Sequence, residues 1–185
     1  MTAQIPAAPQ GCATVNPFIM TDDAAGLIDF LVTVFEGTEV PEARTADTDG
    51  LVLHSEILVG DSTLTVADRK PSWPYTPAFV RVYVDDPAAV LARAEAHGGR
   101  IVTQPTDFFG DVLSRFADPF GHLWWVYKHN PEAATWDSDD ADAAEGDSGA
   151  ADSGESWESY TSPELEYIHS TLIEAMSSLR DPRAS

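Results

Sequence analysis

Two stretches of the sequence repeat the same order of predicted elements, and this repeat limits the possible folds more than any other feature. Each stretch begins with a short strand, continues through a helix preceded by two aspartates, and ends with three strands. The aspartate pairs, at 22–23 and 85–86, lie 63 positions apart. Aspartate is a favoured helix N-cap, and proline after the second pair suits the first turn of a helix. The repeat predicts an α+β fold of two tandem βαβββ modules.

The boundaries of these elements follow from apolar patterning and from turn residues. The helices should end near Gly37 and near Gly98–Gly99, because glycine commonly ends a helix. Residues 108–111 are predicted to form a loop, and 60–61 a two-residue hairpin turn. The predicted strands span 15–20, 39–44, 51–59 and 62–67 in the first copy, and 79–84, 100–104 and the hairpin 112–127 in the second.

The last strand of the second copy carries aromatic residues on both faces. Asp118-Pro-Phe-Gly121 suits a type I turn, and the strand that follows reads Leu-Trp-Trp-Val-Tyr. Side chains alternate along a strand, so Trp125 and Tyr127 share one face while Trp124 and Val126 share the other. Such a strand has a core on one side. Its other side lines either a binding cavity or a second part of the core.

Composition excludes several classes of function. The net charge of −21 argues against binding to nucleic acid or to an anionic membrane. No stretch approaches the ~20 apolar residues of a membrane-spanning helix, and no basic-then-apolar signal peptide is present. The single cysteine, Cys12, cannot form an intramolecular disulfide, which fits a reducing compartment. We therefore expect a cytoplasmic protein.

Four regions are predicted along the chain. Residues 1–13 form a flexible arm, and 14–129 form the duplicated domain. Residues 130–160 contain many acidic and small residues and no Lys or Arg, which predicts a disordered linker. Residues 161–181 predict an amphipathic C-terminal helix that begins with a capping box at Thr161 and docks either on its own domain or on a second subunit. Its apolar stripe consists of Leu165, Ile168, Leu172, Met176 and Leu179.

A set of short motifs within the duplicated domain resembles the vicinal oxygen chelate (VOC) superfamily, which includes glyoxalases, bleomycin-resistance proteins and dioxygenases, and resembles its PhnB-like branch most. The motifs are Asn16-Pro-Phe18, Asp22-Asp-Ala-Ala25, His54-Ser-Glu56, Val59-Gly-Asp-Ser62, Val84-Asp-Asp86, Phe109-Gly-Asp111 and Asp118-Pro-Phe-Gly-His122. The resemblance implies two curled sheets around a cavity, with helices on the outer faces. It also implies a small-molecule ligand, and we expect a homodimer.

Catalytic members of this superfamily hold a divalent metal at one position on each of four strands. Alignment of the motifs places those positions at Asn16, Thr65, Phe79 and Trp125. None is a histidine or a carboxylate, and a transition-metal site needs several such donors. We therefore expect no cofactor, with a divalent metal as the alternative.

Alternation within the implied fold turns one set of side chains toward the cavity. The predicted ligand-binding residues are Phe18, Trp73, Arg81, Tyr83, Phe108, Phe109, Trp125 and Tyr127. They favour a metal-free small-molecule-binding protein, with drug sequestration or resistance as the leading version. The alternative is a glyoxalase-like lyase or isomerase that uses His54 and Glu56 as catalytic residues, with or without metal. The favoured interpretation of these two residues themselves is a polar cluster with Arg81. In a third reading, the acidic segment and helix engage a protein partner.

Overall fold

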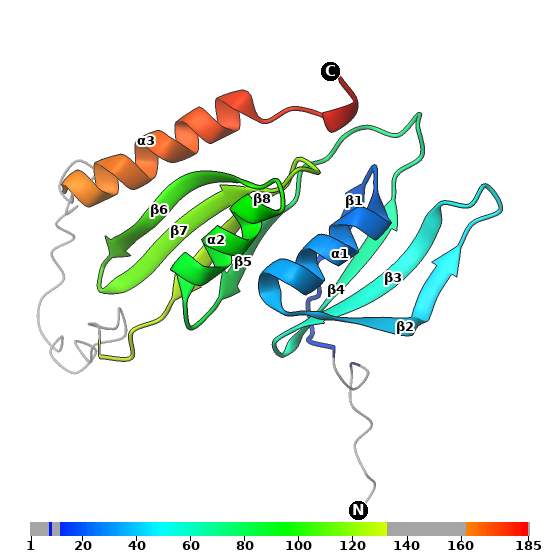
Figure 1. Cartoon of the computed structure of the whole chain (residues 1–185), viewed down its shortest axis with the longest axis horizontal. Coiled ribbons are helices and arrows are strands. Elements are labelled where there is room, and N and C mark those ends of the chain that lie inside the picture. The colour runs from blue at the N-terminus through cyan, green and yellow to red at the C-terminus, as the bar shows by residue number, and fades with distance from the viewer. Residues whose placement is uncertain (1–7, 9–11, 133–161, 185) are drawn as a thin grey trace, which may run out of the picture.

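The computed structural model describes residues 8, 12–132 and 162–184, and it contains two four-stranded sheets (Figure 1). The sheet orders are β1-β4-β3-β2 and β5-β8-β7-β6, so both modules have the same topology. In each sheet the first strand pairs in parallel with the fourth, and the other pairs are antiparallel. The predicted pair of βαβββ modules is confirmed. The elements of the first module are β1 (Phe18–Thr21), α1 (Ala24–Phe35), β2 (Thr38–Ala46), β3 (Val52–Val59) and β4 (Ser62–Asp68).

The second module and the C-terminal segment complete the described chain. They comprise β5 (Phe79–Tyr83), α2 (Pro87–Ala96), β6 (Arg100–Phe108), β7 (Asp111–Ala117), β8 (Leu123–Lys128), α3 (Pro163–Ser178) and a short 3-10 turn, η3 (Pro182–Ala184). Most of the predicted arm, and residues 133–160 of the predicted linker, lie outside the described residues. In the described ranges, no helix is long and apolar enough to cross a membrane.

The two aspartate pairs cap the helices of the modules as the repeat predicts. The carboxylate of Asp23 accepts from the backbone N–H of Gly26 at 2.8 Å, and Asp86 accepts from that of Ala89 at 3.0 Å. The expected end of α1 at Gly37 is one residue too late, because Glu36 takes the left-handed conformation (φ 57°). Gly37 is needed for close packing instead, since a Cβ there would lie 3.0 Å from the carbonyl oxygen of Leu58.

One hydrophobic core joins both modules, and α1 and α2 cover it from the same side of the sheets (Figure 1). Trp124 of β8 is fully buried in this core, stacked on Phe116 at 6.2 Å between ring centroids. It also meets Phe35 of α1 at 5.1 Å, so a helix of the first module packs against the second sheet. Val80 and Val82 pack against the same core, which turns Arg81 to the opposite face of β5.

The predicted loop at residues 108–111 is a two-residue hairpin turn that joins β6 to β7. Phe108 pairs with Asp111, and the two residues between them both have positive φ, 55° at Phe109 and 89° at Gly110. This geometry usually selects Asn-Gly or Gly-Gly, and phenylalanine is unusual there. The missing signal at Phe109 explains why the sequence did not predict a tight turn.

Helix α3 lies on the face of the second sheet opposite α2. Its N-cap is Ser162, whose hydroxyl accepts from the N–H of Leu165 at 3.2 Å. Ile168 packs on Leu113 of β7 and Tyr127 of β8. The predicted helix is thus present and docks on its own domain. The predicted stripe is partly wrong, because Met176 is 46% exposed and the buried positions are Leu165, Ile168 and Ala175.

After α3 the chain returns to the connector between the two modules. The guanidinium of Arg69, which is 3% exposed, forms an ion pair with Asp181. Arg183 donates to the backbone carbonyls of Arg69 and Lys70 at 3.2 and 3.4 Å. These contacts hold the residues that follow α3 against the C-terminal end of β4.

Candidate functional site

The face of the second sheet opposite α2 gathers aromatic and basic side chains, and we call it the aromatic face. Its members are Phe79, Arg81, Tyr83, Leu113, Arg115, Trp125 and Tyr127. Strand register places them there: Arg81 lies opposite Trp125 across β5 and β8, and Tyr83 lies opposite Tyr127. Helix α3 covers the part over β7, because Ile168 packs on Leu113 and Tyr127. The part over β5 is open, with Phe79 and Tyr83 about half exposed.

The rings of Tyr83 and Tyr127 on this face continue into the turn between β6 and β7. Tyr127 meets Tyr83 at 5.6 Å and Phe108 at 6.1 Å between centroids, and Phe108 meets Phe109 at 5.0 Å. The guanidinium of Arg81 lies 4.9 Å from the ring centre of Tyr127. Six of the eight predicted ligand-binding residues are therefore brought together, namely Arg81, Tyr83, Phe108, Phe109, Trp125 and Tyr127.

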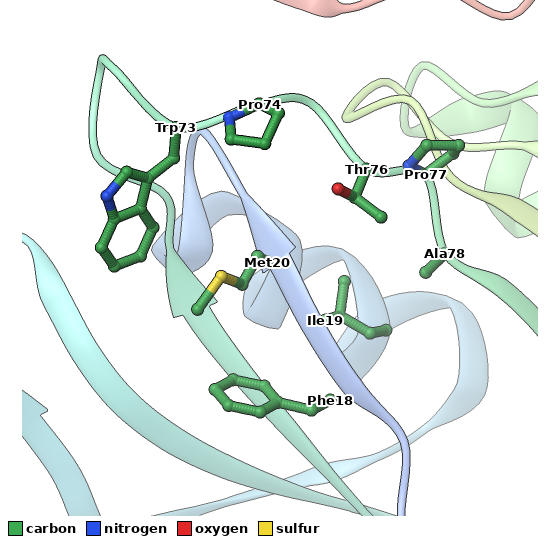
Figure 2. A pocket seen from close by; sticks show the side chains of 8 residues that line it. All are labelled: Phe18, Ile19, Met20, Trp73, Pro74, Thr76, Pro77 and Ala78. Atoms are coloured by element: carbon green, nitrogen blue, oxygen red, sulfur yellow. The ribbon is translucent and has the colours of Figure 1, made fainter.

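The other two predicted ligand-binding residues, Phe18 and Trp73, lie apart from this face. They line a pocket of about 280 Å³ beside β1, together with Met20 and the connector that leads to β5 (Figure 2). Figure 2 shows the rings of Phe18 and Trp73 on either side of the Met20 thioether. The lining of this pocket is mostly apolar, and it includes no member of the aromatic face.

Arg115 is a member of the aromatic face that the sequence analysis did not identify. It is 4% exposed and lies 5.2 Å from the ring centre of Trp125. Its Nη1 donates to the carbonyl oxygen of Ile168 at 2.8 Å and to the hydroxyl of Thr103 at 3.3 Å, while its Nε has no partner. Burial lowers the pKa of the Arg115 guanidinium. Strand alternation could have identified Arg115, because it shares a face of β7 with Leu113. A charged residue on a strand is more often exposed, however, and this favoured a surface position for Arg115.

His54 and Glu56 form a pair on the first sheet. The Nε2 of His54 lies 3.3 Å from a carboxylate oxygen of Glu56, and both side chains are about one-third to two-fifths exposed. Glu56 lies opposite Thr65, which in turn lies opposite Phe18, so all three share a face. The suggested cluster with Arg81 is wrong, because Arg81 lies over Tyr127 and, among the described residues, forms no ion pair with Glu56.

His122 and Asp118 build the turn that positions β8. The Nδ1 of His122 accepts from the N–H of Ala78 at 3.0 Å, and His122 is fully buried. Burial lowers the pKa of His122 and raises that of Asp118. The Asp118 carboxylate accepts from the indole N–H of Trp124 at 2.8 Å. The bond of His122 to the backbone of Ala78 indicates a structural role for this histidine.

The four positions that correspond to the superfamily's metal ligands do not fit a metal. The side chain of Asn16 is engaged with Ala13 in an exposed turn, donating to its carbonyl oxygen at 2.8 Å. Phe79 and Trp125 contact each other edge to face at 5.9 Å and offer no donor atom of the kind a metal needs. Within residues 12–132 and 162–184, no three His, Cys, Asp or Glu side chains gather into a possible metal cluster.

Comparison with known proteins identifies the family. The family description "Glyoxalase/Bleomycin resistance protein/Dioxygenase superfamily" matches residues 13–126, which include every strand and both helices of the two modules except the last residues of β8. The chain belongs to this superfamily. Uncharacterised proteins of Mycobacterium bovis and Mycobacterium tuberculosis are 32% identical over 122 residues, covering 60% of this chain and 79% and 71% of those proteins.

Solved structures share the VOC fold at low sequence identity. Protein PA1353 from Pseudomonas aeruginosa is 22% identical with a TM-score of 0.52, covering 63% of this chain and 98% of that protein. TioX from Micromonospora sp. ML1 is 23% identical with a TM-score of 0.50, covering 63% and 99%. The PhnB protein from Bacillus cereus is 16% identical with a TM-score of 0.50, covering 63% and 100%. Helix α3 lies outside the matched residues 13–126, so it is an addition to the VOC domain.

Proposed function

We propose that this VOC protein binds a small organic molecule on the aromatic face without a metal, and that sequestration of a drug-like compound is its role. The observation that carries the proposal is the gathering of aromatic side chains around Arg81, with Tyr127 against Tyr83 and Trp125 against Phe79. Aromatic faces bind planar ligands through stacked or edge contacts, and a nearby cation adds orientation. The lack of a histidine or a carboxylate at the four metal positions supports a binding role over metal-dependent chemistry.

Native mass spectrometry of the full-length protein, purified without added ligand, tests this proposal. We expect a co-purified small molecule, and we expect Trp125→Ala to lose it while the protein stays folded by circular dichroism. The matched control is Trp73→Ala, which removes an indole from the separate pocket beside β1. Loss of the bound molecule in Trp73→Ala alone would move the site to that pocket. Loss of fold in Trp125→Ala would show that Trp125 belongs to the core.

A glyoxalase-like lyase or isomerase is the second candidate, because His54 and Glu56 lie 3.3 Å apart on one face of the first sheet. A histidine and a carboxylate at that separation can share a proton, as general acid–base catalysis requires. The pair lies on the first sheet and Trp125 lies on the second, so substitutions can test the two functions separately. Turnover that is lost in both His54→Ala and Glu56→Gln, and kept in Trp125→Ala, would favour the enzyme.

The homodimer and the cytoplasmic location are parts of the same proposal. Apolar side chains are exposed on the face of the first sheet that carries Glu56, with Phe18 at 58% and Leu58 at 36%. A surface of this kind is often covered by a partner. Sedimentation velocity would detect the dimer, and Leu58→Asp should weaken it.

A further inference from the structure

Two arginines flank a tryptophan in a single row across the aromatic face. Arg81 of β5 and Arg115 of β7 both lie directly opposite Trp125 of β8. Neighbouring strands are about 5 Å apart, so the Cα atoms of the two arginines are separated by roughly 10 Å, with the indole between them. Residues directly opposite one another across a sheet point to the same face. The row therefore places two positive charges and one large ring on the same surface.

Neither arginine is neutralised by a carboxylate among the residues that the structure describes. This is unusual in a chain with 31 acidic residues and only 10 Lys and Arg. Arg115 is the stronger observation, because it is 4% exposed and its Nε has no hydrogen-bond partner. A buried charge is costly unless it is paired and hydrogen-bonded. An arginine left in this state on a ligand-binding face indicates that its anionic partner is the ligand.

Helix α3 supplies a substitute partner for Arg115. The carbonyl oxygen of Ile168 accepts from its Nη1 at 2.8 Å, while the side chain of Ile168 packs on Tyr127. A neutral carbonyl is a weaker hydrogen-bond acceptor for a guanidinium than an oxyanion is. An oxyanion such as a carboxylate can also accept two hydrogen bonds from one guanidinium in a bidentate arrangement. An oxyanion at this place would replace the carbonyl of Ile168 and would displace the first half of α3.

We propose that the aromatic face binds a planar aromatic molecule that carries an oxyanion, such as a carboxylate or sulfonate. This inference rests on the proposed binding function and names the class of ligand. The ring of the ligand packs on Trp125. Its oxyanion is held by the Arg115 guanidinium through Nη1 and Nη2, in place of the Ile168 carbonyl. Arg81, on the open side of the aromatic face, attracts the anion and contacts the ligand from the other side of Trp125.

Two fluorescent probes of similar shape and different charge test the inference on the full-length protein. One is 8-anilinonaphthalene-1-sulfonate, an aromatic sulfonate, and the other is N-phenyl-1-naphthylamine, its uncharged counterpart. We expect tighter binding of the sulfonate. Arg81→Met and Arg115→Met should each weaken the binding of the sulfonate by about tenfold or more, since a charged hydrogen bond is lost. The affinity for the neutral probe should stay unchanged. Arg44→Met is the control, because Arg44 pairs with Glu39 on the first sheet at 2.7 Å.

The possible results separate the two levels of the proposal. If the wild-type protein binds neither probe, the binding function itself is rejected. If it binds both equally, or if both arginine variants weaken both probes alike, the binding function stands and the anionic class is overturned. Melting curves exclude misfolding, and Arg115→Lys, which keeps the charge, should retain part of the preference for the sulfonate.

Hydrogen exchange of α3 tests the position of the oxyanion. The sulfonate should speed exchange at residues 165–172 in the wild type, because the helix must leave Arg115, and should have no such effect in Arg115→Met. Binding that depends on Arg81 alone, with α3 equally protected with and without probe, would overturn the assignment of Arg115.

Discussion

The docking of α3 depends on few side chains, so one substitution should release it. Ile168 is 4% exposed and packs on Leu113 and Tyr127, whereas Ile173, on the same helix, is 56% exposed. Truncation of a buried isoleucine to alanine costs about 2–5 kcal/mol. Leu165 and Ile168 are the two large buried side chains of the helix. Their burial gives α3 roughly 3–6 kcal/mol at about 1.5–3 kcal/mol each, before the cost of ordering the helix.

We therefore expect Ile168→Ala to lower the free energy of opening of α3 by about 2 kcal/mol, which raises the opening constant about 30-fold. Hydrogen exchange measured by mass spectrometry should show this acceleration in peptides from α3, with little change in the core strands β7 and β8. Ile173→Ala is the matched control. It should not speed exchange, because Ile173 is 56% exposed and alanine is a better helix former than isoleucine.

Two results would refute the reasoning. Equal protection of α3 in Ile168→Ala and in the wild type would mean that Ile168 does not hold the helix to the sheet. Equal acceleration in Ile168→Ala and Ile173→Ala would mean that α3 is held by its own helical stability or by a partner on its outer side.

Three further predictions address other parts of the molecule. Asp181→Ala removes the carboxylate that pairs with the buried Arg69, so carboxypeptidase should digest the C-terminal residues faster than in the wild type; equal rates would show that the pair does not hold the tail. Burial lowers the pKa of His122, so the unfolded chain binds more protons than the native state as pH falls below about 6.5, and stability is lost in that window. Urea denaturation from pH 7.5 to 5 should show a smaller loss in His122→Asn, and an equal slope in both proteins would count against this role. Elemental analysis of protein purified without chelator should give less than one Zn, Ni, Mn or Fe per chain, whereas one metal that disappears in His54→Ala or Glu56→Gln would contradict the expectation.

The duplicated fold could be predicted because local signals agree with one another in both halves. The caps at Asp23 and Asp86, the glycine turn at Gly60 and the alternation around Trp125 each predict the element that forms. The sequence was less informative where tertiary contacts decide. Leu53 is 55% exposed although it alternates with the core residue Ile57, and alternation alone does not distinguish the two positions.

The strand residues of the candidate site could be predicted from the sequence, whereas the position of Trp73 and the cover provided by α3 could not. Alternation on β5 and β8 placed Arg81, Tyr83, Trp125 and Tyr127 on one face, as the structure has them. Trp73 lines a pocket that contains none of these four residues, and its position could not be derived, since a connector residue has no strand register from which to place it. The cover that α3 provides was not predictable as a feature of the site. The apolar stripe of an amphipathic helix indicates which side of the helix is buried, but it does not indicate which surface covers that side.

The position of α3 in the sequence has a consequence for the synthesis of the chain. The second sheet is complete at Lys128, and α3 ends 50 residues later, at Ser178. At roughly 5–20 residues per second, the ribosome needs about 2.5–10 s to add these residues. During these seconds the nascent domain can fold with Leu113 and Tyr127 bare, since their cover has not yet been made. A ligand or a chaperone present at that stage meets the aromatic face before α3 competes for it.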